Sequence, residues 1–475
     1  MKRNLLIFFL CISSIAYSQD IQRFAERGVI GSARYVGMGG AMTAIGGDPT
    51  AAMDNPAGLG LYRHSEISIS LDETIDFSQQ TNYQDIYQRN RFALPQASLI
   101  WAWGDKNKQK GLIFSNLMFN INRLNSYNRD IYVRGQGMGI VPTICNLTNG
   151  LPENEMHQDD IWYNQDIGWL SILGYDSYLI NPISNNQWIP AVDLTDGELS
   201  ISEKGSTDQY TISWAGNINN QWYIGASLNI PTITYTKHTT LHETNRRDGH
   251  ATLNSMFHVS GVGVSASLGI ISRPVEWLRI GASLHTPTTL SLTAQTEGDI
   301  QTRINTTEYN IHTPASGAVS TTYATPLRTS ISIAGQWKNI GLLSLQYDYA
   351  HALREKESQI SPMNDIHTLH AGMEAQVYRS LYINAGYVYE SSFTKKDDIV
   401  GLAYNSIRTD TDYRYTQSSQ YASLGFGYRN NHWVAQVAYQ YGWQLINQYA
   451  SECQANALHV KTQTHRLVCT FAWRL

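Results

Sequence analysis

Apolar side chains alternate with small or polar ones along most of the chain, from about residue 64 to its end. Two of the clearest stretches are 343–350 (LSLQYDYA) and 381–390 (LYINAGYVYE). A period of two is the pattern of a β-strand whose two faces meet different surroundings. The same pattern predicts fourteen strands, near residues 64–72, 95–104, 111–122, 207–218, 221–236, 257–272, 276–292, 322–337, 340–351, 366–378, 381–391, 419–428, 432–443 and 463–475.

The connections between these stretches alternate between two kinds. Short turns follow residues 104, 218, 272, 337, 378 and 428. Long polar connections occupy about 125–206, 239–255, 293–320, 352–365, 392–418 and 444–462. Short turns at one end and long loops at the other are typical of an up-and-down outer-membrane barrel, in which an even strand number leaves both termini in the periplasm. We therefore expect an all-β fold, a 14-stranded antiparallel transmembrane β-barrel in the bacterial outer membrane, with the long loops outside the cell.

Charged residues keep to one face of the predicted strands. The small or polar face includes Glu66, Arg279, Arg328, Asp348, Glu374, Glu390, Arg466 and Arg474. An Arg or Lys on the lipid face near the midplane costs roughly 2 to 4 kcal/mol, so a barrel wall should exclude charge from that face. A soluble β-sandwich would also keep charge away from its core.

The last predicted strand favours the barrel over the sandwich. The sequence stops within this strand, and one of its faces consists of Leu467, Cys469, Phe471, Trp473 and Leu475. It resembles the C-terminal assembly signal of outer-membrane proteins, with Leu475 where Phe is usual, and implies the barrel assembly machinery as a partner.

Composition agrees with this interpretation. Only 15% of residues are charged, while 29 are Tyr and 12 are Trp, and the mean hydropathy is −0.31. Ordinary soluble domains carry about 25% charged residues, whereas a barrel with a polar lumen and aromatic girdles needs fewer. Beyond the first residues no run approaches the ~18 apolar residues of a membrane helix, and the net charge of −5 provides no basic surface for nucleic acid.

The first eighteen residues are expected to be a secretory signal. Lys2 and Arg3 precede an apolar stretch, and Ala16-Tyr17-Ser18 fits a cleavage site before Gln19. Leu10 is too bulky for lipidation at Cys11.

Three cysteines, Cys145, Cys453 and Cys469, would remain after cleavage of the signal. The first two fall in predicted extracellular loops, so a disulfide between them is possible, while Cys469 lies on the predicted lipid face.

Residues 31–62 read GSARYVGMGGAMTAIGGDPTAAMDNPAGLGLY, without alternation. A phosphate-binding loop is excluded because no Lys-Ser or Lys-Thr follows the glycines. Glycine here permits close packing and positive φ, and Asn55-Pro56 predicts a turn before the first strand. Met38, Met42, Ile45, Met53 and Leu59 would gain stability only when packed, which indicates a compact segment.

These residues resemble the N-terminal region of the FadL/TodX family of hydrophobic-compound channels. The matching motifs are GSAR at 31–34, GMGGA at 37–41, Thr43-Ala44 and above all NPAGL at 55–59. Strand pairs at 268–284, 326–349, 372–389 and 423–441 are similar to repeated units of that family. The resemblance implies a fourteen-stranded barrel with an N-terminal hatch at 19–63, including Gly37, Gly39, Gly40, Asn55, Pro56 and Ala57. It further implies passive passage of a hydrophobic ligand from extracellular loops to a lumenal pocket and out through the wall, with no cofactor and no metal.

The chain departs from the family in the insertion at about 125–206, which follows the third strand. Within it, 161–180 (IWYNQDIGWLSILGYDSYLI) is unusually apolar. Trp162, Trp169, Leu170 and Leu173 are candidates for ligand capture, since exposed apolar patches mark binding. A loop packed across the barrel mouth explains the same residues equally well.

Two other function classes, an enzyme and a component of protein export, are alternatives to a channel. An outer-membrane enzyme is disfavoured, because the sequence has no Gly-x-Ser-x-Gly and no His-Glu-x-x-His motif. His285 and His370 lie on predicted lumen faces, where hydrogen bonding is the commoner role. A docking or shuttle component of protein export, as in type IX secretion, shares similar N-terminal segments. Passive uptake of long-chain fatty acids or related lipophilic compounds is favoured, by a monomer in contact with outer-membrane lipids.

Overall fold

The computed structural model describes residues 23–105, 108, 110–245, 249–304, 306–337, 340–351, 364–392 and 401–475. The expected secretory signal at 1–18, with Cys11, lies outside the described residues. Among those described, no helix has the length and apolar character required to cross a membrane.

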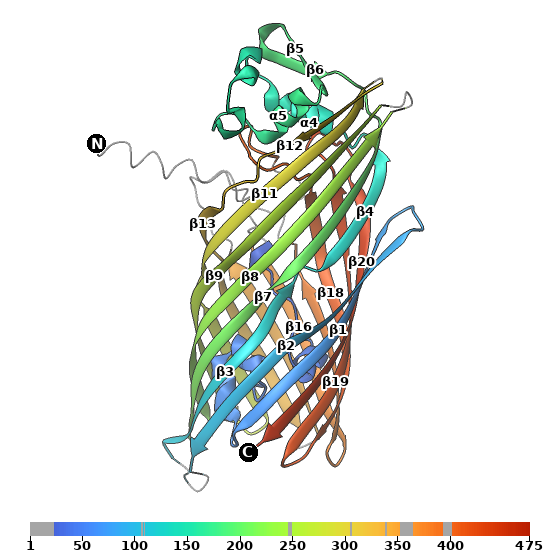
Figure 1. The fold of residues 1–475 in the computed structure, drawn as a ribbon. Coiled ribbons are helices and arrows are strands. Elements are labelled where there is room, and N and C mark those ends of the chain that lie inside the picture. The colour runs from blue at the N-terminus through green and yellow to red at the C-terminus, as the bar shows by residue number, and fades with distance from the viewer. Residues whose placement is uncertain are drawn as a thin grey trace, which may run out of the picture.

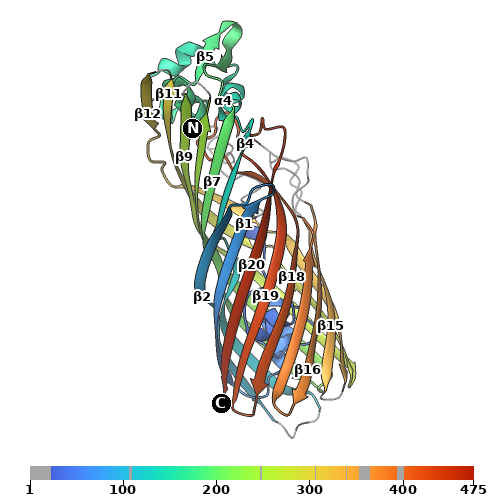
Figure 2. The same cartoon turned by 90° about the vertical axis from the view of Figure 1, so that its right-hand side faces the viewer.

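The chain forms a closed antiparallel barrel of fourteen strands, as the alternation predicted (Figures 1 and 2). The strands are β1 (Glu66–Gln80), β2 (Ile86–Gly104), β3 (Leu112–Ser126), β7 (Asp196–Ile218), β8 (Trp222–Thr244), β9 (His250–Val275), β10 (Leu278–His285), β14 (Leu327–Trp337), β15 (Gly341–His351), β16 (Ile366–Tyr378), β17 (Leu381–Glu390), β18 (Tyr413–Arg429), β19 (Trp433–Tyr449) and β20 (Leu458–Arg474). The last strand closes the barrel on the first, with Phe471 opposite Ile69.

Several strands run further than predicted. The fourth, β7, begins at Asp196 instead of residue 207, and β9 begins at His250 instead of 257. The outer faces of these first residues carry polar side chains such as Ser200 and Asn254. Apolar and polar residues therefore no longer alternate there, although the strands go on pairing with their neighbours. The predicted loop 125–206 consequently shrinks at both ends, with β4 (Arg129–Gln136) pairing along β7.

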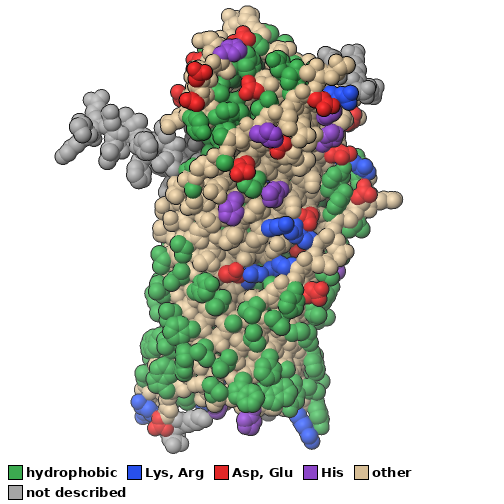
Figure 3. Space-filling view, in the orientation of Figure 1, with side chains coloured by type: hydrophobic (Ala, Val, Ile, Leu, Met, Phe, Trp, Pro, Cys, Tyr) green, Lys and Arg blue, Asp and Glu red, His purple; other side chains and the backbone are tan. Residues whose placement is uncertain are grey.

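On the face that Figure 3 shows, apolar side chains cover the half of the barrel next to the short turns, while the half next to the long loops is polar and charged outside. Exposed apolar side chains on the other strands continue this cover into a belt. Large apolar side chains that are 39% to 61% exposed include Ile67, Trp101, Phe119, Trp214, Trp222, Leu268, Trp277, Ile333, Leu345, Met373, Phe426 and Phe471. Such exposure would be a liability in water, and a lipid-facing band bordered by aromatic residues accounts for it.

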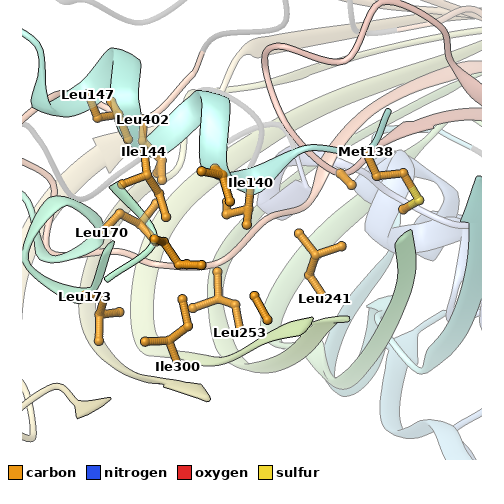
Figure 4. Packing of buried hydrophobic residues seen from close by; sticks show 14 of the residues in the cluster. Met138, Ile140, Ile144, Leu147, Leu170, Leu173, Leu241, Leu253, Ile300 and Leu402 are labelled. Carbon is orange, nitrogen blue, oxygen red and sulfur yellow. The ribbon is translucent and has the colours of Figure 1, made fainter. Parts of the chain in front are cut away.

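A cap covers the loop end of the barrel (Figure 1). It contains α4 (Ile140–Thr148), η3 (Glu153–His157), η4 (Ile161–Tyr163), α5 (Trp169–Asp176), β5 (Ile180–Ile183), η5 (Ser184–Asn186) and β6 (Gln187–Pro190). Ile140 and Ile144 of α4 pack toward Leu241, Leu253 and Ile300 of the wall (Figure 4). One continuous apolar core therefore joins the cap to the inside of the loop end.

The remaining strands extend the wall beside the cap. They are β11 (Thr289–Ile304), β12 (Thr307–His312) and β13 (Val319–Ala324). Both β10 and β11 pair with β9, so together they form one wall strand with an interruption between them. The same holds for β13 and β14, which pair with β11 and β10 respectively.

Candidate functional site

Residues 23–63, hereafter the N-terminal segment, lie inside the barrel, with their helices in the half next to the short turns (Figure 1). They form α2 (Ala33–Gly37), α3 (Ala51–Asp54) and η2 (Pro56–Leu61). Ser32 caps α2 by accepting a hydrogen bond from the amide of Tyr35, and Asn55 caps η2 through the amide of Ala57. Short polar side chains stabilise helix starts in this way, so the segment holds a defined shape.

The glycines of this segment are required for two reasons, backbone conformation and space. Gly39 and Gly40 adopt φ of +60° and +73°, which side-chain-bearing residues rarely adopt. At Gly37 the need is space, because a Cβ atom there would overlap the side chain of Asn384 on β17. The three glycines thus place the segment's backbone directly against the barrel wall.

Glycines of the wall complete this fit. A Cβ atom at any of them would overlap the N-terminal segment: Gly225 meets Pro56, Gly269 meets Asn55, Gly281 meets Thr43, Gly372 meets Met38 and Gly386 meets Gly39. They come from five different strands, so the contact runs around much of the lumen. Their absent side chains let two backbones approach closely.

Polar wall residues hold the segment's backbone. The Asn116 side-chain amide on β3 donates to the carbonyls of Leu59 (2.7 Å) and Tyr62 (3.0 Å). His370 and His285 contact the carbonyls of Gly39 (2.7 Å) and Asp54 (2.8 Å). Both histidines therefore face the lumen and hydrogen bond there, as their strand parity predicted.

A buried ion pair adds the strongest single tether. The guanidinium of Arg34 in α2 binds Glu374 on β16 through two bonds, Nε to Oε2 at 2.7 Å and Nη2 to Oε1 at 3.0 Å. The two side chains are only 8% and 5% exposed. Paired, charge-assisted bonds of this kind are strong and fix orientation, so α2 has one position against the wall.

Above these contacts, three cavities surround residues 23–30. The largest, about 160 Å³, is polar and lined by Arg23, Glu26, Arg129, Glu203 and Arg414 among others. Two smaller ones, of about 30 and 40 Å³, adjoin it, and Arg27 lines all three. The lumen between the cap and the segment's helices is thus divided into small, mostly polar spaces.

One of the smaller cavities lies against the interruptions in the wall. The pairings on either side place Pro287, between β10 and β11, opposite Pro326, between β13 and β14. Proline has no N–H to donate, and the regular pairing stops on either side of these two residues. Beside them the strands stay joined, because the Thr325 amide donates to the Thr288 carbonyl and the Thr288 amide to the Thr325 hydroxyl, both at 3.0 Å. We call residues 286–288 and 325–326 the wall seam, of which all but Pro287 line the cavity.

The seam lies at the border of the apolar belt. Leu284 and Ile331, on its turn side, are 41% and 61% exposed. On its loop side the exposed positions are Thr289 and Ser291. The seam therefore lies where the outer face of the barrel changes from apolar to polar.

The apolar residues of the insertion lie in the cap core. Trp169, Leu170 and Leu173 are buried there, and Trp162 is half-buried with its ring edge-on to Trp169 at 6.1 Å. In this closed arrangement they pack against one another instead of facing solvent. The sequence allowed either ligand capture or a loop packed across the barrel mouth for these residues, and the geometry is that of the packed loop.

Sequence reasoning missed the partners that receive the N-terminal segment. Glu374 and the wall glycines lie in predicted strands, where a lone Gly or a lumenal Glu has many possible explanations. The seam left a clearer signal, since Pro287 and Pro326 interrupt predicted strands 276–292 and 322–337. Proline inside a strand indicates an edge or a break in the ladder.

Replacing Asn55 by Ala is expected to loosen η2 and its contact with the wall. The Asn55 amide nitrogen also donates to the carbonyls of Thr43 (2.8 Å) and Ile270 (3.3 Å). Loss of a cap costs about 1 kcal/mol and each unsatisfied buried group about 1 to 3 kcal/mol. Hydrogen exchange of residues 55–61 should accelerate about tenfold or more, since local opening sets the exchange rate. Unchanged exchange in Asn55→Ala would refute the assignment.

Cys145 of α4 and Cys453, between β19 and β20, are neighbours at the loop end. The side-chain amide of Asn146 donates to Cys453 Sγ at 3.2 Å, and both thiols are free in this structure. Burial, with a smaller contribution from Cys453, raises the pKa of the Cys145 thiol to about 11. We expect these two to form a disulfide on export into an oxidising compartment. Mass spectrometry without reductant should find the linked peptides, and two free thiols would exclude the bond.

Comparison with solved structures finds the same fold in channel proteins. A FadL homologue of Pseudomonas aeruginosa matches with a TM-score of 0.53 at 11% identity, over 94% of this chain and 99% of that one. The toluene transporter TodX of P. putida matches with 0.50 at 12% identity, over 94% and 99%. A TodX variant, described as a monoaromatic hydrocarbon channel, matches with 0.53 at 12% identity, over 94% and 98%. No family model and no curated protein matches the sequence. At these identities the likeness establishes the shared barrel fold.

Proposed function

We propose that this protein is an outer-membrane channel for passive uptake of hydrophobic small molecules, with the N-terminal segment as its hatch. The observation that carries the proposal is the fit of this segment to the lumen. It is held by hydrogen bonds and by the buried ion pairs of Arg23 and Arg34, with no disulfide among the described residues. Such contacts close the barrel and can be exchanged when a ligand arrives. The shared fold with structures described as hydrocarbon channels supports the same function.

Orientation follows from the outer surface. The apolar belt lies next to the short turns, and Leu475 lies at that same end, hydrogen bonded to Ser65 (Figure 2). We place this end, with the C-terminus, toward the periplasm, because outer-membrane barrels have short periplasmic turns. A periplasmic N-terminus stays a prediction, since the first described residue, Arg23, lies in the loop half against Glu203 and Asp412. The cap and the polar half of the wall then project from the cell. Membrane lipid is the expected partner of the belt, the assembly machinery that of β20, and the protein is expected to act as a monomer.

The ligand route that we propose leads from the cap through the lumenal cavities to the wall seam. Opening of the cap would expose Trp162, Trp169, Leu170 and Leu173 for capture of an apolar ligand. At the seam the regular pairing of β10 with β14 and of β11 with β13 is interrupted, so a ligand that parts these strands has to break the two hydrogen bonds between Thr288 and Thr325, each of 3.0 Å. Exit there would deliver it to the outer boundary of the belt.

Extraction of bound compounds tests the proposed binding. The full chain is purified from outer membranes beside a hatch-free porin of similar size, and both are extracted with organic solvent. We expect hydrophobic compounds at near one equivalent in this protein and not in the porin, as identified by mass spectrometry. Equal profiles from the two proteins would contradict specific binding.

A role in protein export is the second candidate, favoured by one observation. Residues 86–95 of β2 pair with β1, whereas pairing with β3 begins only at Gln96. Ile86 and Phe92 on this free edge are 60% and 71% exposed, and such edges accept strands of other proteins. A specific protein that co-purifies with the full chain, and is lost when Phe92 on this edge is replaced by Lys, would favour export over uptake.

A further inference from the structure

One irregular segment of the chain lies inside the loop end of the barrel instead of on its surface. Residues 402–412, hereafter the strut, belong to the connection between β17 and β18 and contain no helix or strand. The stretch 408–412 is nevertheless buried throughout. Leu402 packs in the cap core beside Ile144 and Leu147 (Figure 4). Loops usually run over the surface, because buried backbone polar groups need partners, so the contacts of the strut indicate its role.

The cap is attached to the first half of the strut. The amide of Trp169, the first residue of α5, donates to the Ser406 carbonyl at 2.9 Å. Amides in the first turn of a helix have no partner within that helix, so the strut supplies one. The side-chain amide of Asn405 donates to the Gln165 carbonyl at 3.0 Å, and a Cβ atom at Gly168 would overlap the strut backbone. Opening of the cap at α5 must therefore break contacts with the strut.

Buried charges join the second half of the strut to the barrel wall. The Nζ atom of Lys237 on β8 lies 2.6 Å from Asp410 Oδ2 and 3.2 Å from Asp412 Oδ2, and none of the three side chains is more than 3% exposed. Arg408 binds Asp410 through two bonds of 2.7 Å, and its guanidinium carbon lies 3.8 Å from the centre of the Phe257 ring. A buried charge is stable only when it is paired, so these bonds fix the strut against the wall.

Asp412 also binds the N-terminal segment. Its Oδ2 atom lies 3.4 Å from Arg23 Nη2, and Glu203 Oε1 of β7 lies 3.2 Å from the same nitrogen. The Arg23 side chain is 4% exposed, and its guanidinium carbon lies 4.8 Å from the centre of the Tyr235 ring. Asp412 is therefore shared between Lys237 of the wall and Arg23 of the segment. The strut thus contacts the cap at one end and the start of the N-terminal segment at the other.

The strength of the bond between Asp412 and Arg23 depends on the water around it. Two charges about 4 Å apart attract each other about fourfold more strongly at an effective dielectric constant of 20 than in bulk water. In the closed arrangement both side chains are buried, so their attraction is strong. When the cap opens, water reaches the strut and the attraction falls. Lys237 belongs to the wall and stays there, whereas Arg23 belongs to a segment that can move.

We propose that the strut makes release of the N-terminal segment depend on opening of the cap, with Asp412 as the residue that positions Arg23. With the cap closed, Asp412 and Glu203 hold the start of the segment beside the lumenal cavities. With the cap open, this hold weakens and residues 23–30 leave the passage. The inference rests on the proposed channel function and adds an order to it, because capture of a ligand at the cap then precedes opening of the hatch.

Hydrogen exchange of the purified full chain in detergent, without added ligand, tests this coupling in a double-mutant cycle. Leu173→Ala favours opening of the cap, because Leu173 is fully buried in its core. Asp412→Asn removes the charge that holds Arg23. Residues 24–30 report on the segment, since the Gly28 amide is bonded to the backbone of β3 at 2.8 Å.

Two further variants complete the set. Asp299→Asn is the matched control for Asp412→Asn, because Asp299 is a half-buried carboxylate on β11 that accepts a hydrogen bond from Asn254 at 3.0 Å. Arg23→Gln removes the same contact from the side of the segment and leaves the strut unchanged. Heat-modifiable mobility in gels checks that each variant is folded.

In the wild-type background, Leu173→Ala should raise the exchange rate of residues 24–30 at least about fivefold, the lower end of typical coupling between sites. Asp412→Asn should raise this rate by itself, and addition of Leu173→Ala should then change it less than about twofold, because coupled sites are not additive. Asp299→Asn should leave the effect of Leu173→Ala at full size. Coupling is reciprocal, so Arg23→Gln should accelerate exchange in α5.

The coupling is overturned if Leu173→Ala has the same effect on residues 24–30 with and without Asp412→Asn, or no effect in either background. That result leaves the channel function intact, since uptake does not require the coupling. Exchange of residues 24–30 in the wild type at the rate of an unstructured peptide would speak against the hatch itself, and so against the proposed function.

Discussion

Replacing Gly386 by Ala is expected to displace the N-terminal segment while the barrel stays folded. The new Cβ atom would overlap the backbone of Met38 and Gly39. Backbone atoms cannot rotate out of the way as a flexible side chain can, so the stretch around Gly39 must move as a unit. Overpacking of this kind typically costs 1 to 3 kcal/mol or more, which is comparable with the tethers that hold α2. The displaced segment should no longer seal the lumen.

Permeability measures this displacement. In cells that carry Gly386→Ala, entry of small polar solutes such as a chromogenic β-lactam should rise several-fold above that of the wild type. Gly335→Ala provides the matched control, because no atom lies within 4 Å of the Cβ position at Gly335. It should behave as the wild type. Wild-type permeability in a folded Gly386→Ala would mean that the N-terminal segment does not close the barrel.

The second large effect is expected from Glu374→Gln, which leaves the buried Arg34 without its carboxylate. Removing one partner of a buried ion pair costs about 3 to 5 kcal/mol, because the remaining charge is desolvated and uncompensated. Arg429, whose Nη2 lies 3.7 Å from Glu374 Oε2, adds a second positive charge at the same place. The N-terminal segment should therefore become susceptible to protease near residues 31–48 at a denaturant concentration that the wild type withstands.

An exposed pair serves as the control for this experiment. Arg134 and Asp85 are 3.2 Å apart, with side chains 43% and 56% exposed. Exposed pairs contribute little, so Asp85→Asn should leave protease resistance unchanged. The paired apolar replacement Arg34→Met/Glu374→Met should recover part of the resistance, because no unpaired charge remains. Cleavage at the wild-type rate in Glu374→Gln would show that the pair does not hold the segment.

The strands were predictable because a membrane wall imposes strict alternation. In 343–350, Leu343, Leu345 and Tyr347 are 40% to 53% exposed on the outer face, while Ser344 and Gln346 are buried inside. The alternation fades where the wall leaves the apolar belt. That is why the beginnings of β7 and β9 were assigned to loops.

The candidate site was only half visible in the sequence. Gly39 and Asn55 drew attention through their local chemistry, which depends on neighbours in the chain. Glu374 and Gly386 contribute through contacts more than 300 residues away, and nothing local distinguishes them from other wall residues. The cap shows the same limit, because Trp169 and Leu173 have the same composition whether they face a ligand or a core.

Uptake by whole cells tests the central claim most directly. The full chain is expressed in a Gram-negative host that lacks its own channel for hydrophobic compounds, and entry of radiolabelled laurate is followed beside that of a polar chromogenic β-lactam. The proposed channel with a closed hatch should raise the initial rate of laurate entry several-fold over cells with empty vector, while β-lactam entry stays at the vector level. Laurate entry at the vector level, with heat-modifiable protein present in the outer membrane, would contradict the proposed function.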